Sequence, residues 1–368
     1  MNADVVVAGG GVIGTAIAWS AARGGLSVIL VDPGRGDAAS LVAAGMLGPV
    51  TESVFGEQDL LNLNLLAISR FAGFSAELEA AAGRVTGLRT EGTLAVAYDS
   101  GDLAALRRLT AFRRSIGLQA AELDARACRQ LEPFLAPGVH GGVLATGDLS
   151  VDNRRYLAAL REAARAGGVR TIAGTVTEVA DGTARLAAGD TLRAPRIVVA
   201  AGWATSRIGG LPDRVRKAIR PVKGQILRLR HPAGIPPVIT RTVRAIVQGR
   251  DVYLVPRADG ELVVGATQEE RDDTIVTAGA VHDLLRDAMT AVPAVSELVL
   301  AETSAGLRPG TQDNGPVVGR LGDGLIVAAG HFRNGILLSA ATAEAVTAIL
   351  AGGEPPAEWA PFSPGRFA

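Results

Sequence analysis

A glycine-rich turn near the start of the chain constrains the fold more than any other feature. The apolar run Val5–Ala8 leads into Gly9-Gly10-Gly11-Val12-Ile13-Gly14, which fits G-x-G-x-x-G, and a second apolar run, Leu26–Val31, ends at Asp32. A strand, a glycine-rich turn that opens a helix, and an acid after the next strand are the fingerprint of a dinucleotide-binding βαβ unit. The sequence therefore predicts a parallel sheet of the Rossmann kind.

Each position of this turn has a physical reason for its residue. Gly9 permits a tight turn, Gly11 lets the backbone approach a pyrophosphate, and Gly14 lets the helix pack closely on the sheet. An acid at position 32 can accept hydrogen bonds from ribose hydroxyls and would repel a 2′-phosphate, which favours FAD or NAD over NADP. The cofactor-binding residues predicted in this unit are Gly9, Gly11, Val12, Ile13, Gly14 and Asp32.

Composition limits the class of protein. A chain of 368 residues that is 48% hydrophobic is long enough for two domains with substantial cores. Its 37 basic and 37 acidic residues predict no nucleic-acid or membrane partner. The single cysteine, Cys128, excludes an internal disulfide, and the four histidines lack metal-ligand spacing. No apolar stretch approaches the ~20 residues of a membrane span, and the glycines after Val5–Ala8 argue against a signal peptide. We expect a cytoplasmic protein.

The pattern along the chain predicts two interleaved domains. Helical periodicity at Leu60–Ala82 and Asn153–Ala166, with strands near Val169–Ile172 and Ile197–Ala201, continues the parallel sheet. Between residues 221 and 307 the pattern changes to short alternating strands around one helix, which indicates an antiparallel sheet. The predicted fold class is α/β: a Rossmann-like cofactor-binding domain (1–85, 145–220 and 303–368) with an inserted, mainly antiparallel substrate domain (86–144 and 221–302).

A second informative segment lies near the other end of the chain. Gly330–Leu337 follows an apolar, strand-like run, Leu325–Ala329, and leads into a helical pattern. This order places Arg333 and free backbone N–H groups at a helix N-terminus. Such a terminus concentrates positive potential, so it suits a carboxylate or a ring that becomes anionic on reduction.

Six segments resemble one family, and the resemblance runs in consistent order from residue 5 to about residue 350. They are Ala43-Ala44-Gly45-Met46-Leu47-Gly48, Pro221-Val222-Lys223-Gly224, Tyr253-Leu254-Val255-Pro256-Arg257, Val263-Val264-Gly265-Ala266-Thr267, Ala305-Gly306-Leu307-Arg308-Pro309-Gly310-Thr311 and Gly330–Leu337. Together they look like the glycine oxidases of thiamine biosynthesis, which belong to the D-amino-acid oxidase-like FAD enzymes. The last two segments are more discriminating than the N-terminal fingerprint.

The resemblance implies roles for individual residues. Arg308 matches the arginine that binds the substrate carboxylate, Tyr253 a tyrosine that helps to hold it, and Arg333 an arginine beside the flavin. The sequence alone leaves a structural alternative open for each residue. Arg308 could form a salt bridge, Tyr253 could be a half-buried strand tyrosine, and Arg333 could cap or pack around the helix start. The remaining cofactor contacts implied are Ala44, Gly45, Met46, Val176, Gly202, Gly330, His331, Asn334, Gly335 and Ile336. A plain tight turn is the alternative for residues 44–46. FAD is expected to be non-covalent, because Cys128 is far from every flavin motif.

The implied reaction is oxidative deamination of glycine, and also of sarcosine and small D-amino acids, to glyoxylate, ammonia and hydrogen peroxide. The imine would supply the thiazole of thiamine, and the enzyme would be a homotetramer. A sarcosine oxidase or a D-amino-acid dehydrogenase of the same FAD family is the alternative. Lys223 reads as a residue near the flavin or as a strand-edge surface lysine. Asp251 and Gln268 stand where family members can carry histidine and methionine, which leaves substrate preference open.

Overall fold

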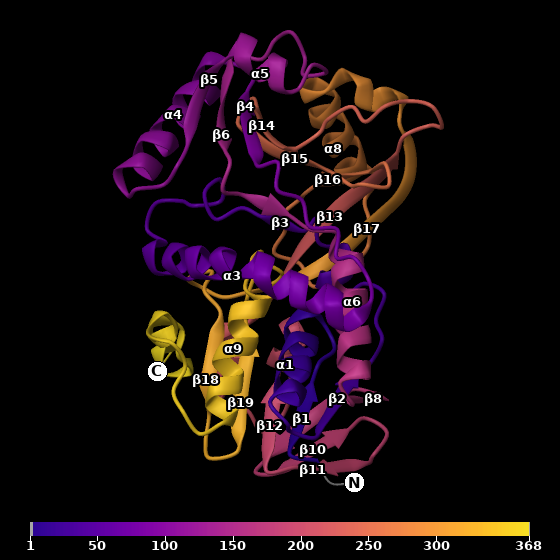
Figure 1. Cartoon of the computed structure of the whole chain (residues 1–368), viewed down its shortest axis with the longest axis vertical. Coiled ribbons are helices and arrows are strands. Elements are labelled where there is room, and N and C mark those ends of the chain that lie inside the picture. Colours follow the sequence, from indigo (N-terminus) through magenta and orange to yellow (C-terminus); the bar gives the residue numbers. More distant parts are fainter. Residues whose placement is uncertain (1–2, 368) are drawn as a thin grey trace.

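The computed structural model describes residues 3–367 and contains two large sheets, one above the other in Figure 1. The lower sheet has six strands, in the order β18 (Val317–Arg320), β19 (Leu325–Ala329), β12 (Arg196–Val199), β1 (Val5–Ala8), β2 (Val28–Asp32) and β8 (Arg170–Ala173). All neighbours are parallel except β18, which runs antiparallel to β19. The predicted parallel sheet is confirmed.

Both faces of this sheet are covered, which explains why its strands are continuous apolar runs. Helices α1 (Val12–Arg23), α6 (Asn153–Ala166) and α9 (Ser339–Leu350) lie on one face, where Val5 and Val7 join their core. A small three-stranded sheet covers the other face, where Val6 and Ala8 are buried. Its strands are β9 (Val176–Ala180), β10 (Thr183–Leu186) and β11 (Thr191–Arg193).

Helix α3 (Gln58–Ala82) passes across the middle of the molecule in Figure 1 and packs on α6 and α9. Its buried face includes Leu63 and Phe71, and the Phe71 ring stacks on Tyr156 of α6 with centroids 5.3 Å apart. The helices predicted at Leu60–Ala82 and Asn153–Ala166 are therefore both present.

The upper sheet has eight strands, and only the β14–β4 pair is parallel. Their order is β17 (Val299–Gly310), β13 (Arg220–Arg230), β16 (Glu261–Gly265), β15 (Arg250–Pro256), β14 (Thr242–Val247), β4 (Thr93–Ala97), β6 (Gly141–Ala145) and β5 (Ala121–Asp124). Helices α5 (Ala125–Leu131) and α8 (Ala278–Ala291) share a core with one face, and α4 (Ser100–Ser115) packs on the other. The expected mainly antiparallel sheet is confirmed.

Two connections bring the sheets together. The segment after β2 contains α2 (Ala39–Val42) and β3 (Met46–Leu47), and β3 pairs with β7 (Leu149–Ser150) just before α6. Strand β17 runs across the predicted 302/303 division, so Arg308 is part of the eight-stranded sheet. The exact division of the chain into domains stays a prediction.

Within residues 3–367, none of the helices has the length and apolarity needed to cross a membrane.

One expectation about the C-terminal segment is wrong. Helix α9 begins only at Ser339, so Arg333 lies in the turns before it and not at a helix N-terminus. Gly330 has φ 73° and Phe332 has φ 46°. These left-handed conformations interrupt right-handed helical geometry at 330 and 332, and further turns at 335–338 delay the helix to Ser339.

Gly14→Ala should destabilise the protein and weaken retention of the FAD that the family resemblance implies. A Cβ at position 14 would lie 1.8 Å from the Gly9 carbonyl oxygen, so the turn and α1 would have to separate. We expect a loss of about 1–3 kcal/mol, the usual range for overpacking. Thermal unfolding and the flavin content of purified protein measure this. Gly36→Ala is the control, because nothing lies within 4 Å of its added Cβ. Equal stability of the two variants would contradict the prediction.

Candidate active site

The glycines of the turn differ in how closely their surroundings approach them. A Cβ on Gly9, which has φ +114°, would lie 2.4 Å from the Ala200 carbonyl oxygen. A Cβ on Gly11 would meet only the Ser40 hydroxyl, at 3.1 Å, and the same hydroxyl accepts the Val12 N–H at 3.0 Å. Helix α1 thus presents its first turn, with Val12 and Ile13, beside a backbone that a pyrophosphate can approach.

Asp32 lies at the carboxyl end of β2, next to this turn. One carboxylate oxygen accepts the Gly34 N–H at 3.2 Å, and the other accepts from Arg161 of α6 at 3.1 Å. A Cβ on Gly10 would lie 2.5 Å from the Asp32 side chain. The carboxylate is therefore fixed against the turn, as recognition of a ribose requires.

The other predicted contacts from this half of the chain follow neighbouring strands. The Ala200 N–H donates to the Ala8 carbonyl at 2.8 Å, and the chain then turns at Gly202, which has φ 59°. On the other side, the Gly174 N–H donates to the Asp32 carbonyl at 3.1 Å shortly before Val176 opens β9. Both lie after the carboxyl ends of parallel strands, where doubly wound sheets bind ligands.

The 330–336 turn lies against the end of β17. The Phe332 N–H donates to the Pro309 carbonyl at 2.9 Å, which places this turn beside the strand that carries Arg308. Asn334 and Ile336 are buried, Gly335 is half-buried, and Arg333 is exposed enough to face solvent. The Arg333 guanidinium lies 3.4 Å from Glu57 and is stacked over the Phe332 ring at 5.4 Å.

His331 is buried in the same turn, and its Nε2 lies 3.0 Å from the Thr342 hydroxyl of α9. Burial lowers the pKa of His331 to about 3. The imidazole is therefore neutral at physiological pH and supplies neither charge nor a proton.

The 44–46 loop lies against the eight-stranded sheet. Gly45 has φ +75°, and its carbonyl accepts the Val151 N–H at 2.8 Å. Ala44 and Met46 pack with residues of β13, β15 and β16 in one apolar cluster that includes Tyr253. Small residues in this loop thus allow close approach to the face of the sheet that carries Tyr253.

Arg308 and Tyr253 lie on that same face. A Cβ on Gly224 would lie 2.2 Å from the Arg308 guanidinium, and a Cβ on Gly265 would lie 2.5 Å from the Tyr253 hydroxyl. The two glycines therefore give both side chains room to lie along the sheet. Burial raises the pKa of Tyr253, and the nearby Arg308 charge opposes that shift. The phenol is a neutral hydrogen-bond donor at physiological pH.

Sequence reasoning missed a charged pair beside Tyr253. Arg244 is directly opposite Tyr253 in the β14–β15 register, and its Nη1 lies 2.9 Å from Glu52. The loop that carries Glu52 is fixed by Asp148, which accepts the Val50 N–H at 2.9 Å and the Thr51 N–H at 3.1 Å. Burial raises the pKa of Asp148 to about 6. No local motif announces this pair, because only strand register brings Arg244 to Tyr253.

Four other residues receive definite positions. The Lys223 side chain is fully buried and its Nζ lies 2.6 Å from Asp273, so the interpretation as a surface lysine is wrong. Asp251 and Gln268 are exposed. Cys128 is buried in the core under α5 and α8, and burial raises the pKa of its thiol to about 11.

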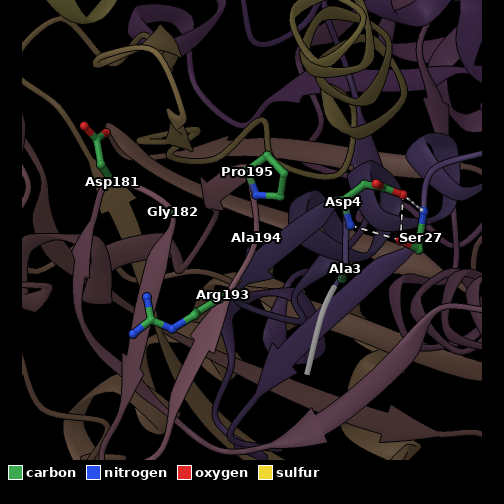
Figure 2. Close-up of a pocket in the computed structure, with 8 residues that line it drawn as sticks. All are labelled: Ala3, Asp4, Ser27, Asp181, Gly182, Arg193, Ala194 and Pro195. Carbon is green, nitrogen blue, oxygen red and sulfur yellow. Dashed lines mark hydrogen bonds between the residues drawn. The ribbon is translucent and has the colours of Figure 1, made fainter.

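A surface hollow lies at the amino-terminal ends of the strands of the six-stranded sheet (Figure 2). It is lined by Ala3, Asp4, Ser27, Asp181, Gly182, Arg193, Ala194 and Pro195. Three of its segments immediately precede β1, β2 and β12. Ligands of doubly wound sheets bind at the carboxyl ends of the strands, so this amino-terminal edge is not the cofactor site.

The parallel sheet, the glycine turn and the adjacent Asp32 define a dinucleotide-binding protein of the α/β class. The chain belongs to the DAO family of FAD dependent oxidoreductases, whose family model matches residues 4–349. The open backbone at Gly11, the fixed Asp32 and the tight glycine contacts fit an extended FAD. The predicted family and cofactor are confirmed.

Individual relatives agree with this assignment. The glycine oxidase of Geobacillus kaustophilus is 33% identical over 371 residues, covering 98% of this chain and 96% of its own. A crystal structure of the glycine oxidase from that organism has a TM-score of 0.91 with 32% identity and covers 99% of both chains. The bifunctional protein ThiO/ThiG of Synechocystis is 34% identical over this whole chain, which spans only 54% of that longer protein.

His331→Gln should reduce the loss of stability on acidification. The folded pKa of His331, about 3, lies below the ordinary value of 6.5, so the unfolded chain binds a proton that the folded chain refuses. The resulting loss in the free energy of unfolding is absent above pH 6.5 and grows by about 1.4 kcal/mol for each pH unit below that value. Thermal unfolding of the FAD-loaded protein at pH 7.5 and 5.5 should show a smaller drop in the variant. Identical drops would mean that His331 titrates normally.

Proposed function

We propose that the chain is an FAD-dependent glycine oxidase. One observation carries the choice of a carboxylate substrate: Arg308 is half-buried beside Tyr253 and, among residues 3–367, has no carboxylate within 4.0 Å. The reaction consumes glycine, water and oxygen and releases glyoxylate, ammonia and hydrogen peroxide. Sarcosine and small D-amino acids are expected as further substrates.

Arg308 has donors to spare for a substrate. Its Nη1 donates to the Thr267 carbonyl at 3.2 Å and to the Lys223 carbonyl at 3.4 Å. These contacts fix the plane of the guanidinium and leave Nη2 and Nε to bind a carboxylate with two parallel hydrogen bonds. Tyr253 can donate a third hydrogen bond. Such a clamp fixes the orientation of the substrate Cα.

The predicted cofactor residues would hold FAD along one continuous path. The turn Gly9–Gly14 would bind the pyrophosphate and Asp32 the adenosine ribose, while residues 44–46 and 330–336 would border the ring. FAD bound there would accept a hydride from the substrate Cα and return the electrons to oxygen. Arg333 would add positive charge beside the bound ring, partly offset by Glu57.

The transfer of hydride from a neutral amine requires no general base. Glycine that binds with a neutral amine can form the protonated imine (iminium) directly on losing hydride, with the nitrogen lone pair supplying the new bond, and water then hydrolyses the iminium to glyoxylate and ammonium. His331 is neutral and bonded to Thr342, and Glu52 is paired with Arg244. Neither is needed to remove a proton in this scheme.

The surroundings favour a small substrate. Met46, Ile226 and Val255 belong to the apolar cluster around Tyr253, so a bulky polar side chain would lose its hydration there. Relatives named glycine oxidase and ThiO match over the full chain, which supports glycine as substrate and the thiazole of thiamine as the destination of the imine. We infer a cytoplasmic homo-oligomer, with a tetramer as the expected state.

Arg308→Ala should raise the KM for glycine by at least ~100-fold while FAD stays bound. Two charge-assisted hydrogen bonds would be lost, each contributing about 1.5–3 kcal/mol, and 1.4 kcal/mol corresponds to tenfold. Steady-state peroxide production and the flavin spectrum of the purified variant measure both quantities. Arg185→Ala, at an exposed pair with Glu178, is the control. Unchanged kinetics in Arg308→Ala would remove this residue from the site.

A further inference from the structure

A polar cluster around the buried Lys223 lies next to the backbone that holds Arg308. Strand β13 pairs with a segment beyond β16, where the Lys223 and Glu269 backbones exchange hydrogen bonds of 2.9 and 3.0 Å. The Lys223 side chain is 0% exposed and ends 2.6 Å from Asp273 and 4.0 Å from Glu269. Asp273 also accepts the Ile275 N–H at 3.0 Å, so the ion pair fixes the course of this segment.

The cluster is connected to Arg308 through Thr267. The Thr267 hydroxyl donates to Glu269 at 2.6 Å and accepts the Gln225 N–H at 2.9 Å. Gln225 in turn donates from its side-chain amide to Glu269 at 2.7 Å. Both carbonyls that accept from the Arg308 guanidinium, those of Thr267 and Lys223, therefore belong to this network.

We propose that Lys223, Asp273 and Glu269 are positioning residues for substrate binding, because they hold the two carbonyls that set the plane of the Arg308 guanidinium. The inference rests on the proposed function only in taking Arg308 as the carboxylate site. It assigns Lys223 a structural task behind the sheet, and it explains why a cation is buried there with acidic partners on one short segment.

The course of the 267–273 segment depends on the charge of Asp273. The hydrogen bond from Lys223 lowers the pKa of Asp273 to about 2, so this carboxyl group is ionised throughout the physiological range. Removal of the Asp273 charge would leave a fully buried ammonium with Glu269 as its remaining acid at 4.0 Å. Since an unpaired buried charge is costly, the 267–273 segment would rearrange towards it and shift the Thr267 carbonyl.

Asp273→Asn tests this with acetate, a carboxylate that lacks an amine. Titration calorimetry on the FAD-loaded enzyme should show an acetate Kd at least tenfold above wild type, with unchanged flavin content. With glycine, KM should rise more than kcat falls. Asp273→Glu should restore part of the affinity. Asp272→Asn is the matched control, because Asp272 is 73% exposed and its ion pair with Arg207 is long, at 3.9 Å. The acetate affinity of this variant should equal that of the wild type.

The outcomes separate this inference from the proposed function. Wild-type acetate affinity in Asp273→Asn, or an equal loss in Asp272→Asn, would overturn the positioning role. Loss of FAD in step with acetate affinity would do the same, since it would indicate general loosening. If Arg308→Ala binds acetate normally, the carboxylate site itself is wrong. Should Asp273→Asn fail to fold, Glu269→Gln decides, with weakened acetate binding expected and unchanged binding contradicting the proposal.

Discussion

Two buried guanidinium groups join the cofactor side of the molecule to the substrate side. Arg257 donates to the carbonyls of Val151 and Ala44, and Arg228 donates to the carbonyl of Leu41 at 3.3 Å while pairing with Glu261. Both side chains extend from the eight-stranded sheet into the loop after β2. Buried cations are stable only with such partners. The position of the 44–46 loop against Tyr253 therefore depends on these two arginines. They also help to fix the distance between the glycine turn at 9–14 and the Arg308–Tyr253 pair.

Small residues then decide what fits on the sheet face. Gly224 and Gly265 accommodate Arg308 and Tyr253, and a Cβ on Gly306 would lie 3.0 Å from Val42 of α2. Tyr253 lies directly opposite Gly265 in the β15–β16 pair, Arg308 lies two residues beyond the partner of Gly224 in the β13–β17 pair, and Val42 approaches Gly306 from outside the sheet. This is why glycine recurs in the segments that carry the family resemblance: the backbone must be approached there, by a side chain of the sheet or by the loop.

Much of this could be predicted from the sequence where the determinants are local. The βαβ unit, the apolar strands and the helices at 58–82 and 153–166 follow from periodicity and glycine spacing within short windows. The start of α9 could not, because two turns, at 332–333 and 335–338, precede it, and the first requires a positive φ at Phe332, a residue type that rarely adopts one. The burial of Lys223 and the Glu52–Arg244 pair also escaped, since both depend on pairing with segments distant in sequence. The site residues inferred by resemblance lie in compatible places, and their roles stay predictions.

Electrostatics distinguishes Arg308 from the other arginines around the site. Arg161, Arg244 and Arg333 face the carboxylates of Asp32, Glu52 and Glu57, which satisfy much of their attraction for an anion. Arg113 and Arg257 resemble Arg308 in having oxygen partners without charge, but their side chains are buried, and Nη groups of both donate to backbone carbonyls. Arg308 alone among these six combines neutral partners with partial exposure. Its full charge is available to an incoming carboxylate, and the cost of desolvating it is already partly met by the two carbonyls behind it.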